Sequence, residues 1–150
     1  MAKMEELLHV IREQSPYSPE KVTATDADVR ATEAKLGVKL PVSYRTLVTN
    51  SGPDDAGSRL LYWIGPNLPP SNDIAKLNTG RFALWPKFLI AVIGEVGGDE
   101  FCFDTRYPDA SGEYPIVHWN HEINDENTTE FRQIADSLVD FLLMALKGRA

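Results

Sequence analysis

The stretch "FLIAVIGEVGGDEFCFDT", residues 88–105, decides the fold. Its first seven residues are apolar on both alternating faces, which favours a central strand of a sheet. Its last six residues alternate phenylalanine with polar or small side chains, as a second strand would. Gly97 and Gly98 lie between the two runs, and glycine can adopt the positive φ angles of a tight turn. The stretch is therefore predicted to be a β-hairpin.

A nucleotide-binding loop is the first alternative to a hairpin. A Walker A loop requires the pattern G-x-x-x-x-G-K-[ST], and this pattern does not occur in the chain. A Rossmann fingerprint requires G-x-G-x-x-G between a strand and a helix, whereas Gly94, Gly97 and Gly98 have a different spacing and precede a strand. The hairpin explains these glycines better, and no cofactor is expected.

A metal site is the second alternative, suggested by Asp99, Asp104, His118 and His121. Zinc needs three or four convergent nitrogen, sulfur or oxygen ligands. His118 and His121 are three residues apart, a spacing that places side chains on opposite faces of a strand. The two rings would not bind one ion without a turn between them, so no metal site is predicted.

Catalysis is also not indicated by any motif. Cys102 lies within a predicted strand, and no G-x-S-x-G nucleophile elbow is present. Ser51 and Ser58 lie in predicted loops without a neighbouring base, and no acid–base pair has an interpretable spacing. The chain is therefore predicted to be a non-enzymatic protein.

Local patterns predict the remaining elements. Helices are expected at residues 4–13, from the N-cap Thr25 to Gly37, and from Pro41 to Asn50. Strands are expected at 59–65 and 115–120, with one helical turn around residues 73–77 inside a long loop. The apolar stripe of residues 127–148 predicts a last helix, which Asn127 and Glu130 would cap. The fold class is α+β: an antiparallel sheet of about four to five strands packed by helices from both chain ends, in one domain spanning 1–150.

Composition narrows the choice of partner. The chain has 150 residues, one cysteine and a formal charge of −7, which argues against sequence-independent binding of nucleic acid. Ten acidic residues but one basic residue, Arg106, lie between Glu95 and Glu130, so this part of the chain can attract a basic partner. Charged residues interrupt the N-terminal apolar run, and no apolar run is long enough to span a membrane. We expect a cytoplasmic protein without membrane contacts.

Three blocks of sequence together resemble the SUKH superfamily. The first is "ATEAKLGVKLPVSYRTLVTNSG", residues 31–52, with the motif residues Glu33, Leu36-Gly37, Leu40-Pro41 and Tyr44. The second is the hairpin stretch, and the third is "PIVHWNHE", residues 115–122. The resemblance covers roughly residues 20–146, and Ser51 departs from the usual Asn-Gly turn. It implies an α+β domain that functions by protein binding, as bacterial toxin-immunity proteins and fungal cell-wall-assembly regulators do.

The acid excess and the resemblance together lead to a prediction of function. The chain is expected to neutralise a toxin domain, possibly a nuclease whose basic surface meets acidic residues of this chain. The candidate partner-binding residues are Asp99, Glu100, Asp104, Asp109 and Glu113, followed by Asp54, Asp55, Trp63 and Trp119. Tryptophan is included because it is common at binding hot spots. The alternative is a regulatory or scaffolding interaction domain without a toxin partner.

Overall fold

The computed structural model describes residues 2–14, 23–51, 61–65, 68, 70–81, 85–95, 98–121 and 130–147. Its elements, in chain order, are the helices α1 (Ala2–Gln14), α2 (Asp26–Leu36) and α3 (Val42–Asn50), the short 3₁₀ helix η1 (Pro70–Asn72), helix α4 (Ile74–Thr79), strands β1 (Leu89–Gly94), β2 (Glu100–Asp104), β3 (Ile116–Trp119) and β4 (Phe131–Ala135), and helix α5 (Leu138–Lys147).

The four strands form one antiparallel sheet in the order β1-β2-β3-β4. The predicted hairpin is confirmed, because β1 pairs directly with β2 and the Glu95 amide donates to the Asp99 carbonyl oxygen at 2.9 Å. Gly98 has a φ of +105°, a conformation that glycine adopts more readily than other residues. Gly97 lies outside the described residues. Gly98 therefore belongs to a turn between neighbouring strands.

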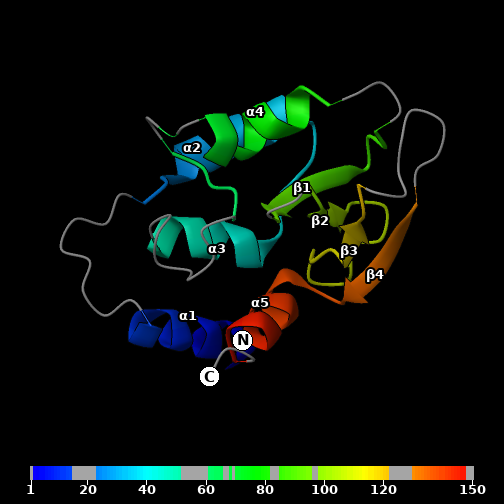
Figure 1. Cartoon of the computed structure of the whole chain (residues 1–150). Coiled ribbons are helices and arrows are strands. Elements are labelled where there is room, and N and C mark those ends of the chain that lie inside the picture. The colour runs from blue at the N-terminus through cyan, green and yellow to red at the C-terminus, as the bar shows by residue number, and fades with distance from the viewer. Residues whose placement is uncertain are drawn as a thin grey trace.

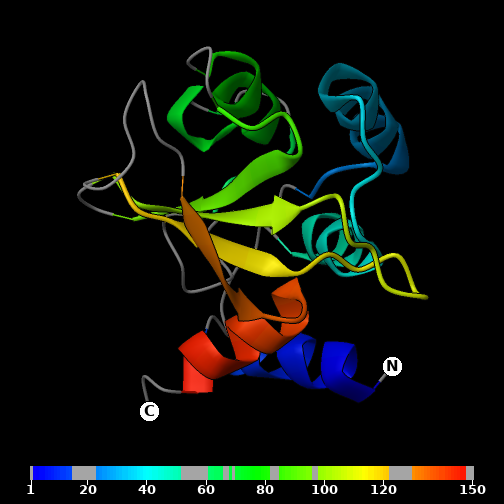
Figure 2. The same ribbon diagram turned by 90° about the vertical axis from the view of Figure 1, so that its right-hand side faces the viewer.

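Helices cover both faces of this sheet (Figures 1 and 2). Helix α4 packs against β1 on one side, with α2 beside it. Helices α1 and α5 lie side by side on the other side, where α5 also contacts β4 and α3. The first and last helices of the chain thus complete one layer together, which confirms the predicted α+β class with packing from both chain ends.

The core lies between these layers and depends on large side chains from separate elements. β1 is buried at all six positions, so its continuous apolar run reflects cover on both faces. The largest fully buried side chains include Leu7 and Ile11 of α1, Tyr44 and Leu47 of α3, and Leu138, Leu142 and Leu146 of α5. Each side chain of this size contributes about 1.5–3 kcal/mol when it leaves water.

Capping interactions position the helices that the first sequence block predicts. The Thr25 hydroxyl accepts from the Asp28 amide at 3.1 Å, and the Asp28 carboxylate accepts from the Thr25 amide at 3.0 Å. Gly37 ends α2 with a φ of +73°. The Glu33 carboxylate then accepts from the Leu40 amide at 2.7 Å, which fixes the connection to α3. The motif residues of this block therefore have local structural roles.

The predicted strand at residues 59–65 is wrong as a continuous strand. In the part that the structure describes, residues 61–65, Leu61 forms an isolated bridge to Ile93 and Trp63 forms one to Asp73. Successive amides in this segment have partners on different elements: Tyr62 donates to the Val92 carbonyl oxygen, and Trp63 donates to that of Asn72. The segment links β1 to the start of α4 and does not extend the sheet.

The predicted helix at 127–148 is wrong in its first part. Phe131–Ala135 form β4, which pairs with β3, and α5 begins at Leu138. The spacing of Phe131 and Ile134 imitates a helix, but pairing with the edge of β3 determines the structure. Ser137 is the cap, since its hydroxyl accepts from the Asp140 amide at 3.2 Å. Asn127 lies outside the described residues.

The start of α5 at Ser137 gives a direct prediction for stability. We expect Ser137→Ala to lower the free energy of unfolding by about 0.5–2 kcal/mol, because the alanine cannot accept the Asp140 amide hydrogen bond. Ser137→Asn, which retains a capping acceptor, should stay within a few tenths of a kcal/mol of wild type. Urea unfolding checks both values. Equal or higher stability of the alanine variant would instead indicate a helix interior, where alanine is the best residue.

Candidate protein-docking site

A buried carboxylate fixes an arginine at the end of β2. Asp104 is only 4% exposed, and its two oxygens accept from Nε and Nη2 of Arg106 at 3.0 and 2.9 Å. The Arg106 amide donates to the same carboxylate at 3.2 Å. The side-chain hydrogen bond to Asp104 raises the pKa of Arg106. Two parallel bonds of this kind define the plane of the guanidinium group as well as its position.

Aromatic rings surround the fixed guanidinium group. Its central carbon lies 3.8 Å from the ring centroid of Phe88, 4.9 Å from that of Tyr107 and 5.5 Å from that of Phe131. The rings of Phe88 and Phe131 meet edge to face at 5.8 Å. These distances are typical of cation–π contacts. Phe88, Arg106, Tyr107 and Phe131, which come from segments adjoining β1, β2 and β4, are called the Arg106 face below.

The composition of the Arg106 face suits it to protein binding. Tyrosine and arginine are enriched among the residues that contribute most to protein interfaces. The Tyr107 side chain is 61% exposed and therefore available to a partner. Arg106 is already held by Asp104 and Phe88, so it loses little conformational freedom when a partner binds. The face thus offers a rigid cation beside an accessible aromatic ring.

The loop that carries Tyr107 is ordered by Asp109. One carboxylate oxygen of Asp109 accepts from the Ser111 amide at 2.8 Å, the Ser111 hydroxyl at 2.7 Å and the Glu113 amide at 3.0 Å. The bond from Ser111 is the main cause of the lowered pKa of Asp109. Gly112 completes the turn with a φ of +85°. The loop between β2 and β3 therefore has a defined shape although it is exposed.

Glu113 joins this loop to helix α3. Its carboxylate accepts from the Ser43 amide at 3.0 Å and also from the Ser43 hydroxyl. A carboxylate is favourable at this position because the first turn of a helix has unpaired amides and the positive end of the helix dipole. Tyr114 adds a second link by donating its hydroxyl to the Lys39 carbonyl oxygen at 2.8 Å. The loop is thereby anchored at its far end.

An apolar cavity of about 400 Å³ opens next to Glu113. Met4 of α1, Val42 of α3 and Val139 of α5 supply its apolar wall, and Ser111 and Glu113 reach it from the loop. Its volume is within the range of cavities that bind small molecules or inserted groups. The loop thus has the Arg106 face at its beginning and an apolar cavity at its end.

The five acidic residues predicted around the hairpin do not form one exposed surface. Glu100 and Asp104 are buried at the two ends of β2. Glu113 is half-buried against α3, and Asp99 is half-buried beside two histidines. Among these five residues only Asp109 is exposed. These five acidic residues are close in sequence, but burial and pairing within the protein leave most of them unable to meet a partner.

The other predicted binding residues either lie in the core or fall outside the residues that the structure describes. Trp63 has no exposed surface, and Trp119 is 7% exposed with its ring centroid 5.0 Å from that of Trp85. Asp54 and Asp55 lie outside the described residues. Sequence reasoning missed Arg106 and Tyr107. The available signal was a lone arginine two residues after an acidic residue that ends a strand.

Glu100 belongs to a buried polar network below a second cavity. Its carboxylate binds both terminal nitrogens of Arg81 and accepts from the Tyr62 hydroxyl at 2.7 Å. Burial, followed by the Glu100 hydrogen bond, raises the pKa of Tyr62. Gly94 leaves room for this hydroxyl, because a Cβ atom there would overlap it. The network fixes the connection between α4 and β1.

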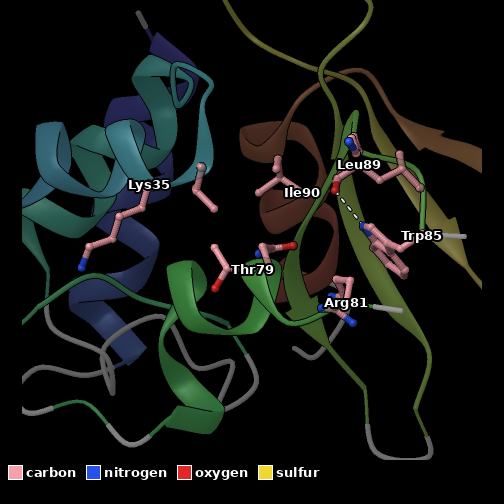
Figure 3. A pocket seen from close by; sticks show the side chains of 9 residues that line it. Lys35, Thr79, Arg81, Trp85, Leu89 and Ile90 are labelled. Carbon is pink, nitrogen blue, oxygen red and sulfur yellow. Dashed lines mark hydrogen bonds between the residues drawn. The ribbon is translucent and has the colours of Figure 1, made fainter. Parts of the chain in front are cut away.

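The second cavity, about 340 Å³, lies between α2, α4 and β1. Figure 3 shows Lys35 on the α2 side and Arg81 and Trp85 on the opposite side. The Arg81 guanidinium stacks 4.3 Å from the Trp85 ring centroid, and Trp85 Nε1 donates to the Leu89 carbonyl oxygen at 3.0 Å. The Asn78 side chain bonds both the amide and the carbonyl group of Ala91. These polar groups hold the cavity walls together.

The prediction that His118 and His121 lie on opposite faces is wrong. His118 Nε2 lies 2.9 Å from one oxygen of Asp99, and His121 Nδ1 lies 2.6 Å from the other. His121 occupies a turn directly after β3, and this turn brings its ring back to the hairpin. The side-chain hydrogen bond from His121 is the main cause of the lowered pKa of Asp99. Strand alternation does not apply beyond the end of β3.

The fold and these motifs agree with a known family. The sequence model of the SMI1 / KNR4 family (SUKH-1) matches residues 23–144. The chain belongs to this family. The SUKH-1 match begins just before α2, includes the whole sheet and ends within α5. It supports a role as a protein-interaction module. A search of curated proteins gave no significant match.

None of the helices in the described residues combines the length and the apolar character needed to cross a bilayer.

The role of Asp109 in the loop can be tested by hydrogen exchange. We expect Asp109→Ala to increase exchange at the Ser111 and Glu113 amides about tenfold or more, because both amides lose their acceptor. Asp109→Asn retains a side-chain oxygen and should leave both rates within about threefold of wild type. Unchanged protection in the alanine variant would contradict this role.

Proposed function

We propose that this SUKH-1 protein is a cytoplasmic immunity protein that binds a cognate bacterial toxin domain and blocks its activity. The observation that carries the proposal is the Arg106 face, where Asp104 and Phe88 hold an arginine beside the exposed ring of Tyr107. Family membership supports binding as the mode of action. We infer that neutralisation needs no reaction by this chain, only occupation of the toxin surface.

Charge favours a partner with a basic surface. The formal charge of −7 gives long-range attraction toward such a domain, and a nuclease that binds phosphates has the required sign. The exposed carboxylate of Asp109 lies on the same loop as Tyr107 and attracts such a partner, and Asp104 compensates the positive charge of Arg106. Short-range affinity then comes from Tyr107 and from the apolar cavity at the other end of the same loop.

A growth assay separates this proposal from a general scaffolding role. We expect co-expression of the chain to restore growth of cells that produce the C-terminal toxin domain encoded by the adjacent upstream gene. The two proteins should also co-purify in equal amounts. An interaction domain without a toxin partner would give neither rescue nor a stoichiometric complex, which would contradict the proposed function.

Substitution of Tyr107 tests the position of the docking site. We expect Tyr107→Ala to weaken toxin binding about 10- to 30-fold, as loss of a hot-spot aromatic residue does. Met144→Ala is the matched control, because Met144 is 58% exposed but lies on α5. Its affinity should equal that of wild type within about twofold. Calorimetry measures the dissociation constants of both variants. A larger loss of affinity for Met144→Ala than for Tyr107→Ala would place the docking site elsewhere.

The electrostatic part of the proposal has its own test. We expect the association rate constant to fall about tenfold between 50 and 300 mM salt, because screening weakens long-range attraction. Asp109→Asn keeps the loop acceptor and should lower the rate constant at low salt. Asp26→Asn, an exposed charge change on α2, serves as the control. Stopped-flow measurements that show no salt dependence would refute steering by charge.

A further inference from the structure

Three potential metal ligands converge where the β1–β2 hairpin meets the end of β3. One side-chain donor atom from each of Glu95, Asp99 and His118 lies within 4.8 Å of the other two. Neighbouring ligands of a tetrahedral ion with bonds of about 2.0–2.1 Å are roughly 3.3 Å apart. Glu95 is exposed, so rotation about its side-chain bonds can bring its carboxylate closer to the other two donors.

The fold holds two of these donors in fixed positions. The His118 ring stacks on Phe101 with centroids 5.1 Å apart, which orients Nε2 toward Asp99. Glu95 and Asp99 flank the turn, and the Glu95 amide donates to the Asp99 carbonyl oxygen. The side chains of Asp99 and His118 are each 21% exposed, so an ion in solution can reach them. The donors are therefore both accessible and positioned by the backbone.

His121 supports this group from outside. Its main-chain amide and its Nδ1 atom both contact Oδ1 of Asp99, at 3.1 and 2.6 Å. The ring lies close to Gly98, where an added Cβ atom would be only 3.2 Å from His121 Cγ. Glycine at this position therefore permits the positive φ of the turn and the approach of the ring. Hydrogen bonds of this type commonly orient the ligands of a metal centre.

We propose that Glu95, Asp99 and His118 bind one zinc ion, with His121 as a positioning residue for the Asp99 carboxylate. Imidazole nitrogen and carboxylate oxygen are both regular zinc ligands, and three protein ligands leave a fourth position for water. On binding, the His118 ring shifts its proton from Nε2 to Nδ1 by exchange with water, so that Nε2 and the Asp99 carboxylate both bond to the ion. The site is separate from the Arg106 face and does not depend on the proposed toxin partner.

The ion would act as a clamp within the sheet. Glu95 and Asp99 flank the hairpin turn, whereas His118 belongs to β3, so one ion joins segments about 20 residues apart in sequence. An ion that binds the folded chain more tightly than the unfolded chain stabilises the fold. The clamp therefore links zinc concentration to the stability of the hairpin end of the sheet.

Zinc binding to the full chain, first treated with a chelator, tests the proposal. Competition with a chromophoric zinc indicator should show one site per chain, and thermal unfolding should shift upward with added zinc. His118→Gln should abolish the site, and His121→Ala should weaken it about 10- to 100-fold. Glu95→Gln should also weaken zinc binding. Because Glu95 is exposed, this substitution should leave the fold intact, so misfolding would not account for the weaker binding.

His9→Gln is the matched control. His9 is an exposed histidine of α1 that pairs with Glu13 at 3.1 Å, away from the hairpin. We expect this variant to bind zinc as wild type does. When cobalt replaces zinc, its absorption bands should be visible in wild type and in His9→Gln and should be absent in His118→Gln. Absence of one-to-one binding in wild type, or equal losses in both variants, would overturn the assignment.

Discussion

Two buried carboxylates at opposite ends of β2 impose the main constraint on this structure. Glu100 and Asp104 are 6% and 4% exposed, in a strand that has neighbours on both edges and helices over both faces. Transfer of a carboxylate into such an environment costs several kcal/mol unless an opposite charge and hydrogen bonds compensate. Each end of β2 therefore needs an arginine, and the chain supplies Arg81 and Arg106.

The two ion pairs have different consequences. Arg81 comes from the segment after α4 and stacks on Trp85, so pairing with Glu100 secures the layer over β1. Arg106 follows β2 itself and turns back to Asp104, which places its guanidinium on Phe88 and leaves Tyr107 exposed. One pair thus stabilises the interior, whereas the other creates a rigid surface suited to a protein partner. The proposed docking site is a product of the same constraint that shapes the core.

Local signals explain which parts of the fold could be predicted from sequence. Thr25, Asp28 and Gly37 determine the limits of α2 through contacts within a few residues, and Gly98 acts in the same way in the hairpin turn. The apolar spacing from Phe131 to Ala135 predicts a helix, whereas the observed strand depends on pairing with β3, which spacing does not reveal. The Ser137 cap of α5 was a local signal, but the longer apolar stripe obscured it.

The candidate site was harder to predict because it depends on contacts distant in sequence. Sequence spacing indicates that Glu100 is a surface charge, although Arg81, 19 residues earlier, neutralises it. The residue type of Trp63 indicates a binding hot spot, but no part of the side chain is exposed. Strand alternation predicts that the two histidines lie on opposite faces, yet a turn brings both to Asp99. Charge counts and residue types indicate the class of partner, whereas burial decides which side chains can meet it.

The most direct measurement is amide hydrogen exchange of the chain alone and in complex with the partner domain proposed above. If the Arg106 face forms the interface, protection on binding concentrates in residues 104–113 and in the segments around Phe88 and Phe131. Protection confined to α2 and α4, with residues 104–113 unchanged, would contradict the proposal that the Asp104–Arg106 pair builds the docking surface.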